Sequence, residues 1–199
     1  FPTIDKPNQK TTQEIEMTVP DSFVTLSNGL LKNSQKKGNL RTDHWVMDKP
    51  HAPYLFFLGA GEYAEVKDKP WRGKVPIAYY VEKEYADVAK RIFGKTSEMI
   101  EFYSKRLDYD YPWPKYYQMT AQEYVSGAME NTTAVLHSSM AQQDAESLND
   151  QNIWEATIAH ELFHHWFGDL VTAESWANLT VNESFANYSE YLWLEHKYG

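Results

Sequence analysis

The strongest constraint on the fold of this chain is a change in its hydrophobic pattern near Glu82. Before that residue, short segments alternate polar and apolar residues and end at turn residues, which is typical of β-strands. From residue 84 to residue 107, apolar residues recur at the spacing of a helix, and Gly94 predicts a kink or break there. The sequence therefore predicts an α+β fold, with a β-rich part over residues 1–82 and a mixed part over residues 83–199.

The individual elements are predicted from the same patterns. Strands are expected over residues 14–19, 23–26, 44–47, 54–58, 75–81, 116–120 and 132–137. Turns are expected at Asn28-Gly29, Lys37-Gly38-Asn39, Asp48-Lys49-Pro50 and Lys69-Pro70. One helix is expected over residues 153–167, capped by Asn149 or Asp150 and ended by Gly168, and another over residues 182–197.

The charge and the cysteine content exclude several classes of protein. The net charge is −9, and because a nucleic-acid-binding protein needs a basic face, no nucleic-acid partner is expected. From residue 150 onward, eight acidic residues stand against one basic residue, which describes either a solvated acidic face or a region that attracts cations. The absence of cysteine excludes disulfides and thiolate ligands. No apolar run reaches the roughly 18 residues of a membrane helix, and no signal-peptide pattern is present.

The residues His160-Glu161-Leu162-Phe163-His164 form an H-E-x-x-H motif inside the first predicted C-terminal helix. The two histidines are four residues apart, so both imidazoles leave the same face of the helix and can bind one metal ion. Glu161 lies beside that face, where its carboxylate can reach a water without being a ligand. Because a catalytic zinc usually takes three protein ligands, the motif predicts a further ligand elsewhere.

Glu183 is the predicted third ligand, because eighteen residues separate it from His164 and it lies near the start of the next helix. Glu174 lies in the intervening loop, where solvent exposure is expected, and Glu190 is two turns further along. His165 points about 100° away from its neighbour, so packing or a hydrogen bond is expected rather than ligation. H-E-x-x-H also occurs by chance, but the predicted capped helix, the glycine that ends it and the glutamate at this spacing favour a zinc site.

These residues resemble the zinc aminopeptidases of the aminopeptidase N type, within the gluzincin metallopeptidases. The shared pattern is H-E-x-x-H, eighteen residues and a glutamate, with similar flanking residues over 164–172 and 182–186. A second shared motif is the exopeptidase signature of that family, Gly127-Ala128-Met129-Glu130-Asn131. The resemblance spans nearly the whole chain and is strongest from Tyr117 onward.

The resemblance implies that residues 1–82 end an N-terminal all-β domain. Residues 83–199 would then form the first lobe, a sheet plus active-site helices, of a thermolysin-like catalytic domain. It also implies one Zn²⁺ ion held by His160, His164 and Glu183, with Glu161 as general base and then acid. The substrate would be a peptide with a free N-terminus. The main chain of residues 127–131 would pair with it like an added strand, and Glu130 would bind its α-ammonium group.

The same resemblance implies that the chain is a fragment. The family's transition-state tyrosine and its helical C-terminal domain would lie beyond Gly199, so we expect the fragment alone to be nearly inactive. Its partner would be the missing C-terminal part of the same protein. An exported or periplasmic protein is the working hypothesis for localisation. Departures from the family's more usual residues, which bear on substrate fit and packing, occur at Asp169, Asn178, Thr180 and Ser184.

Three other functions are open. A zinc endopeptidase of the thermolysin kind would share the ligands but lacks the segment 127–131. A relative that couples peptidase and epoxide hydrolase activities usually has a second glycine in place of Ala128. A non-catalytic zinc scaffold is a third possibility, although a structural site needs no base such as Glu161. Asn182, directly before the predicted ligand, is expected either to cap its helix or to orient a ligand.

Overall fold

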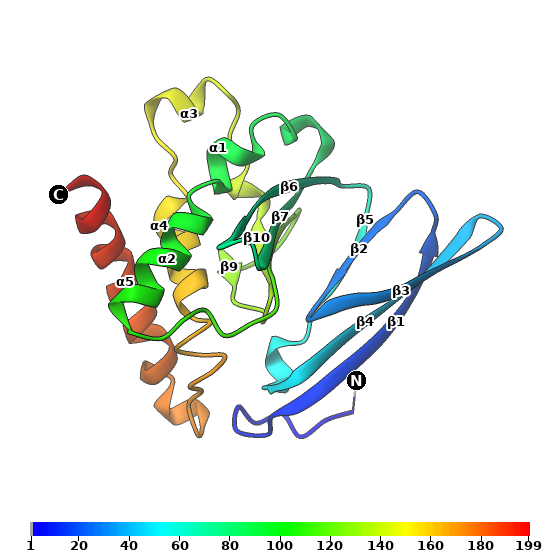
Figure 1. Cartoon of the computed structure of the whole chain (residues 1–199), viewed down its shortest axis with the longest axis horizontal. Coiled ribbons are helices and arrows are strands. Elements are labelled where there is room, and N and C mark those ends of the chain that lie inside the picture. Colours follow the sequence, from blue (N-terminus) through cyan, green and yellow to red (C-terminus); the bar gives the residue numbers. More distant parts are fainter. Residues whose placement is uncertain (1) are drawn as a thin grey trace.

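The computed structural model describes residues 2–199 and has an α+β architecture, as predicted (Figure 1). Its strands are β1 (Thr11–Pro20), β2 (Val24–Ser27), β3 (Leu30–Lys37), β4 (Leu40–His51), β5 (Leu58–Gly61), β6 (Ala64–Trp71), β7 (Val75–Val81), β8 (Tyr116–Ala121), β9 (Ala128–Met129) and β10 (Ala134–Ser138). Its α-helices are α1 (Ala89–Phe93), α2 (Thr96–Arg106), α3 (Ser147–Asp150), α4 (Glu155–Phe163) and α5 (Thr180–Tyr198). Short 3₁₀ helices are η1 (Pro53–Leu55), η2 (Lys83–Tyr85), η3 (Ser139–Ala141) and η4 (Trp176–Asn178).

The strands form three sheets. The strands β1 to β5, over residues 11–61, are called the β-rich part from here on and form an antiparallel sheet in the order β1-β4-β3 and the pair β2-β5. The third sheet has the order β6-β7-β8-β10-β9, in which β7, β8 and β10 are parallel and the two outer strands are antiparallel to their neighbours. Figure 1 shows this sheet between the β-rich part and the helices α2, α4 and α5.

Both faces of the five-stranded sheet are covered, and β7 shows why. Its residues Ile77 and Tyr79 belong to the core shared with the helices, whereas Ala78 and Tyr80 belong to a second core shared with the β-rich part. Successive side chains of a strand point to opposite faces, so a strand buried on both sides must be apolar throughout. The apolar run over residues 75–81 therefore reflects a central strand.

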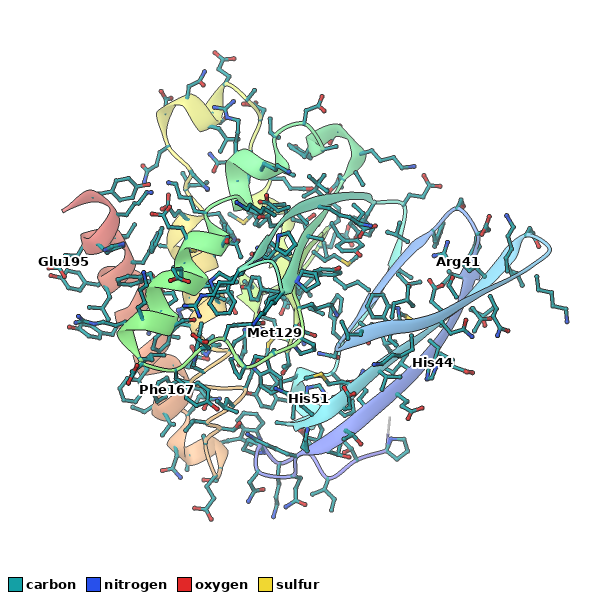
Figure 2. All side chains as sticks on the ribbon, viewed as in Figure 1. Arg41, His44, His51, Met129, Phe167 and Glu195 are labelled. Carbon is teal, nitrogen blue, oxygen red and sulfur yellow. The ribbon has the colours of Figure 1, made fainter. Side chains whose placement is uncertain are left out.

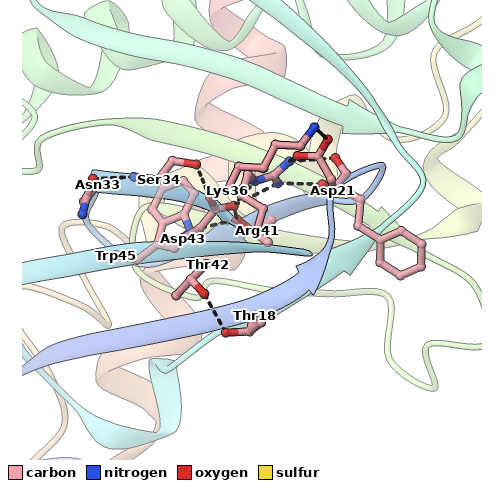
Figure 3. Close-up of polar contacts among 11 residues, drawn as sticks. Thr18, Asp21, Asn33, Ser34, Lys36, Arg41, Thr42, Asp43 and Trp45 are labelled. Atoms are coloured by element: carbon pink, nitrogen blue, oxygen red, sulfur yellow. Dashed lines mark hydrogen bonds and ion pairs between the residues drawn. The ribbon is translucent and has the colours of Figure 1, made fainter. Parts of the chain in front are cut away.

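A polar cluster holds the β-rich part together beside this second core (Figure 3). The guanidinium of Arg41 donates to both carboxylate oxygens of Asp43, at 2.9 Å each, and to the backbone oxygens of Asp21 and Phe23. Burial alone would raise the pKa of the Asp43 carboxyl, but hydrogen bonds from Arg41 and from two hydroxyl groups hold it below its ordinary value. Because the guanidinium and the carboxylate satisfy each other, we assign this cluster a structural role.

The predicted boundary at residues 82–83 does not match the arrangement of the sheets. Strands β6 and β7 precede it, yet they pair with each other and with β8 in the sheet that carries β9. The change from one sheet system to the next lies between β5 and β6, near residues 61–64. The boundary was misplaced because the pattern change at Glu82 marks the first helix after β7 rather than the start of a new sheet.

Several predicted turns and strands also differ from the structure. The strand predicted over residues 54–58 is η1 followed by the start of β5. The turns predicted at Pro50 and Pro70 lie inside β4 and β6, at register shifts where proline removes no ladder hydrogen bond. Strand β3 was not predicted, because seven of its eight residues are exposed and give no apolar alternation. β6 was not predicted either.

Of the two predicted C-terminal helices, the first, α4, is shorter than predicted and the second, α5, is slightly longer. α4 begins at Glu155 and ends at Phe163, and no side chain caps it, because Asn149 and Asp150 belong to the separate helix α3. α5 begins at Thr180, so Asn182 lies inside it and is not its cap. The break predicted at Gly94 is confirmed, since it separates α1 from α2. Across residues 2–199, none of the helices is long and apolar enough to cross a membrane.

Candidate metal centre

The two motif histidines face each other across one turn at the end of α4. His160 lies in the last turn, and His164 directly follows it with helical backbone angles of φ −54° and ψ −25°. Their Nε2 atoms are 2.9 Å apart. The helix ends earlier than predicted, but the helical conformation of His164 keeps both imidazoles on one face.

Glu183 brings a carboxylate to the same point from the first turn of α5, which packs against α4 (Figure 1). Its Oε2 lies 3.2 Å from Nε2 of His160 and 3.5 Å from Nε2 of His164. The His164 side chain is 1% exposed and that of Glu183 is 42% exposed, so the cluster opens to solvent on the α5 side. The three predicted ligand residues therefore meet at one accessible point.

The hydrogen bonds behind the imidazoles decide what this cluster can bind. Nδ1 of His164 lies 3.0 Å from the backbone oxygen of Phe167, and Nδ1 of His160 lies 2.7 Å from Oε1 of Glu190. Both partners are acceptors, so each Nδ1 carries a proton, and each Nε2 presents a lone pair once its own proton has left. With the Nε2 atoms deprotonated, two nitrogen lone pairs and one carboxylate oxygen face one another. A cation would satisfy all three, and two imidazoles with one carboxylate are a donor set that suits zinc.

The titration of the cluster is consistent with a cation site. Although burial lowers it, hydrogen bonds to Glu183 and Glu190 raise the pKa of His160 to about 10. Hydrogen bonds from the two histidines hold the pKa of the Glu183 carboxyl well below its ordinary value. Protons would thus occupy this point when no metal is bound, and metal binding would release them.

Glu161 lies beside the three ligands rather than among them. It is buried, and its Oε2 has no hydrogen-bond partner within residues 2–199. Burial is the main reason that the pKa of this carboxyl rises to about 8, while the positive charge of a protonated His164 would lower it. Ligand-type atoms of Glu161, Glu130 and His164 all lie within 4.8 Å of one another. An unpaired buried carboxylate next to a metal cluster is suited to accept a proton.

The segment over residues 127–131 forms one edge of the five-stranded sheet. β9 pairs with β10 on one side, and Gly127 extends the pairing by accepting from the backbone N–H of Ser138 at 2.8 Å. In the sheet as described, no strand lies on the other side of β9, so its backbone can accept an added strand. Figure 2 labels Met129 of this edge.

The last two residues of this segment are buried in the protein. Asn131 donates from Nδ2 to the backbone oxygen of Leu55 at 3.3 Å and so ties the segment to η1. Glu130 is 6% exposed, and its Oε1 accepts a hydrogen bond from the hydroxyl of Tyr54 at 3.2 Å. The segment therefore places one carboxylate beside the metal cluster and one free strand edge next to it.

Other candidates from the sequence lie outside the cluster. His165 is fully buried, donates to the backbone oxygen of Glu161 and accepts from the backbone N–H of Thr133 at 3.0 Å, so it packs the helix end as expected. Glu174 is exposed in the loop. Asn182 is buried but contacts none of the three candidate ligands, since its side chain bonds to Ala173 and Tyr54.

Sequence reasoning missed two residues of the site. Tyr54 lies 76 residues before Glu130, and no local pattern joins them. The second is Glu190, whose carboxylate accepts from Nδ1 of the candidate ligand His160 at 2.7 Å and does not meet the other candidate ligands. The sequence spacing could have identified Glu190, because it is seven residues after Glu183 and therefore lies on the same face of α5.

The position of Glu190 gives a first prediction. Carboxylates that accept from a ligating imidazole raise its basicity, and their loss typically lowers metal affinity about 10–100-fold. We therefore expect Glu190→Gln to lower zinc affinity by about this factor, as measured by competition with a chelator. Glu195→Gln is the matched control, because Glu195 lies exposed on the outer side of α5 (Figure 2). Equal affinity in the two variants would contradict the supporting role of Glu190.

A cavity of about 970 Å³ lies away from these residues, between the β6–β7 hairpin and α2. Its lining includes Trp71, Glu101 and Phe102. Arg72 at its edge already pairs with Glu101 at 2.9 Å. We place the candidate site at the His160–His164–Glu183 cluster and not in this cavity, because the cluster brings three ligand-type atoms together beside the buried carboxyl group of Glu161.

Comparisons with known proteins bear on the same residues. Residues 92–199 match the Peptidase family M1 domain. The chain is similar to glutamyl aminopeptidase of Sus scrofa, with 28% identity over 98% of this chain and 21% of the relative. It is similar to aminopeptidase M1 of Arabidopsis thaliana, with 31% identity over 96% of this chain and 22% of the relative. It is also similar to tricorn protease-interacting factor F2 of Thermoplasma volcanium, with 32% identity over 96% of this chain and 24% of the relative. The chain thus spans between a fifth and a quarter of the length of these relatives.

Proposed function

Because this chain belongs to the peptidase family M1, we propose that it carries the metal centre and the substrate-amine site of a zinc-dependent aminopeptidase. The observation that carries the proposal is that two clusters of possible metal-binding side chains share His164. His160, His164 and Glu183 present three acceptors to one point, and ligand-type atoms of Glu161, Glu130 and His164 lie within 4.8 Å of one another. The relatives that are named aminopeptidases support the same activity.

In this proposal His160, His164 and Glu183 would hold one Zn²⁺ ion. Zinc bound there supplies Lewis-acid chemistry, because it polarises a carbonyl group and acidifies a water molecule. Glu161 accepts a proton from the attacking water and returns it to the nitrogen of the leaving amine. Its burial supports this role, because a carboxyl whose pKa lies near neutrality exchanges protons readily.

The edge strand and Glu130 would select the substrate. A peptide that adds to the free edge of β9 through main-chain hydrogen bonds runs along Gly127, Ala128 and Met129. The carboxylate of Glu130 pairs with the α-ammonium group at the end of that peptide, while Asn131 fixes the segment to η1. Only the first peptide bond of the substrate then reaches Glu161. The result is release of single N-terminal residues.

The proposal extends to the domains and partners. The sheet with β9 and the helices α4 and α5 would form the first lobe of a thermolysin-like catalytic domain, and the β-rich part would end an N-terminal domain. The remaining length of the relatives suggests that further parts of the same protein complete the cleft. The 199-residue chain tested alone should therefore be nearly inactive, with peptides that have a free N-terminus as substrates of the whole protein.

A pair of peptides tests the function directly in the whole zinc-loaded protein. We expect cleavage of a free peptide and little cleavage of its N-acetylated form, because acetylation removes the charge that Glu130 would bind. Glu130→Ala should raise KM and lower kcat for the free peptide, since this pair orients as well as binds the substrate. Efficient internal cleavage of the blocked peptide would instead indicate an endopeptidase of the thermolysin kind.

A non-catalytic zinc scaffold is the second candidate. It would hold the metal equally well, but the buried Oε2 of Glu161, which has no hydrogen-bond partner within residues 2–199, argues against it. Such a group costs about 1–3 kcal/mol of stability when it is left without partners. A purely structural site has no need for that cost. Zinc binding without hydrolysis of either peptide would favour the scaffold.

A further inference from the structure

Tyr54 is placed at the metal centre by a part of the chain that is remote from the motifs. It belongs to η1, and its half-buried ring stands edge-on against Trp176, with ring centroids 4.9 Å apart and an interplanar angle of 76°. Its hydroxyl lies between two side chains. One is Glu130, whose Oε1 is 3.2 Å away, and the other is Asn182, whose Nδ2 is 3.0 Å away.

The directions of these hydrogen bonds follow from one backbone group. The N–H of Ala173 can only donate, and it lies 3.0 Å from Oδ1 of Asn182. The amide nitrogen of Asn182 must therefore face Tyr54 and donate to the phenol oxygen. The single proton of that phenol is then free to point at Glu130. Burial, with the neighbouring carboxylates, raises the pKa of Tyr54 well above its ordinary value, so the hydroxyl keeps this proton.

The resulting chain of hydrogen bonds connects the helix of the candidate metal ligand Glu183 to Glu130, the proposed binding group for the substrate amine. Asn182 is the residue directly before Glu183 on α5, and Glu130 lies at the edge of the sheet next to β9. Tyr54 joins the two through contacts that span 128 and 76 residues of sequence. These hydrogen bonds thus fix the Glu130 carboxylate relative to α5, the helix that carries the candidate metal ligand Glu183.

We propose that Tyr54 is a positioning residue that fixes the Glu130 carboxylate for the α-ammonium group of a peptide substrate. This inference rests on the proposed aminopeptidase function and deepens it. The terminal torsion of a glutamate is broad, so a carboxylate without a donor on one oxygen would rotate. The hydroxyl of Tyr54 binds Oε1 and leaves the other oxygen of Glu130 for the ammonium group.

The test compares two ligands that differ only in the amino group. L-Alanine hydroxamate and propanehydroxamate both bind zinc, but only the first carries an α-ammonium group. We define the amine factor as the inhibition constant of propanehydroxamate divided by that of L-alanine hydroxamate, both measured on one protein sample. A factor above one means that the ammonium group strengthens binding. Because both constants come from the same sample, loss of folded protein or of zinc does not change the ratio. It is measured in the whole zinc-loaded protein for wild type, Tyr54→Phe, Glu130→Ala and the double variant.

We expect Tyr54→Phe to lower the amine factor about 10- to 100-fold, because hydrogen bonds to charged groups carry about that much. Propanehydroxamate should bind the variant as it binds wild type. In the Glu130→Ala background the same change should have no further effect. Tyr63→Phe is the control, because Tyr63 packs beside the second core, outside this hydrogen-bond chain.

The outcomes separate this inference from the function on which it rests. A wild-type amine factor near one would overturn the proposed aminopeptidase function itself. A large factor that falls in Glu130→Ala but not in Tyr54→Phe would overturn only the role of Tyr54. Equal weakening of both hydroxamates in Tyr54→Phe would also overturn it, because that result describes a general structural role.

Discussion

Replacing Glu161 with glutamine in the whole protein is expected to abolish most turnover while the metal stays bound. Glutamine keeps the shape of the side chain, but its amide cannot accept a proton at neutral pH. Removal of a general base typically lowers kcat by about 10²- to 10⁴-fold. The buried, unpaired Oε2 of Glu161 makes this expectation specific, because within residues 2–199 no other role is visible for that oxygen. The measurement is kcat on a free peptide, with zinc content determined on the same sample.

The matched control for this variant is Glu174→Gln. It makes the same chemical change at an exposed glutamate of the loop between α4 and α5, and we expect wild-type turnover. A Glu161→Gln protein with a kcat near that of wild type would show that the base lies elsewhere. A Glu161→Gln protein that loses its zinc would instead show that this carboxylate is a ligand.

Removal of a predicted ligand is expected to release the metal. Glu183→Ala deletes one of the three acceptors, and because this side chain is 42% exposed, the helix should tolerate the change. The loss of zinc affinity should exceed the about 10–100-fold expected for a supporting residue such as Glu190. His160→Ala should have the same effect, with loss of peptidase activity in both variants. Zinc content after gel filtration is the measurement.

The zinc affinities of variants at three glutamates of α5 test the ligand assignment. The order of zinc affinity should be wild type, then Glu190→Gln, then Glu183→Ala, with Glu195→Gln equal to wild type. Undiminished zinc in Glu183→Ala would contradict the assignment of Glu183. If Glu190→Gln instead lost more zinc than Glu183→Ala, the two glutamates would have to exchange roles.

The parts of the site that were predictable are those that lie within one helical turn. His160 and His164 share a face wherever the backbone between them is helical, so neither the early end of α4 nor its missing cap affects their pairing. Glu161 follows from the same geometry. The side-by-side packing of α4 and α5 is less local, and the position of Glu183 was inferred from its spacing rather than from a contact.

Contacts between distant segments were not predictable. The hydrogen bond between Tyr54 and Glu130 depends on how η1 packs against the edge of the sheet, and Tyr54 was expected in a strand. The membership of β6 and β7 in the five-stranded sheet likewise depends on pairing with β8, which follows them by more than thirty residues. Alternation identifies a strand, but it does not state which strand is its neighbour.

For this protein the sequence by itself determined the α+β class, the helical periods and the local geometry of the H-E-x-x-H motif. These features depend on interactions between residues at most four positions apart, so the chain carries them wherever it folds. Only the tertiary structure decided that two Nε2 atoms and a carboxylate oxygen meet at one point, that Glu190 accepts from His160, and that Tyr54 reaches Glu130. Each of these depends on burial of apolar faces that brings remote segments together, and that burial is a property of the packed molecule as a whole.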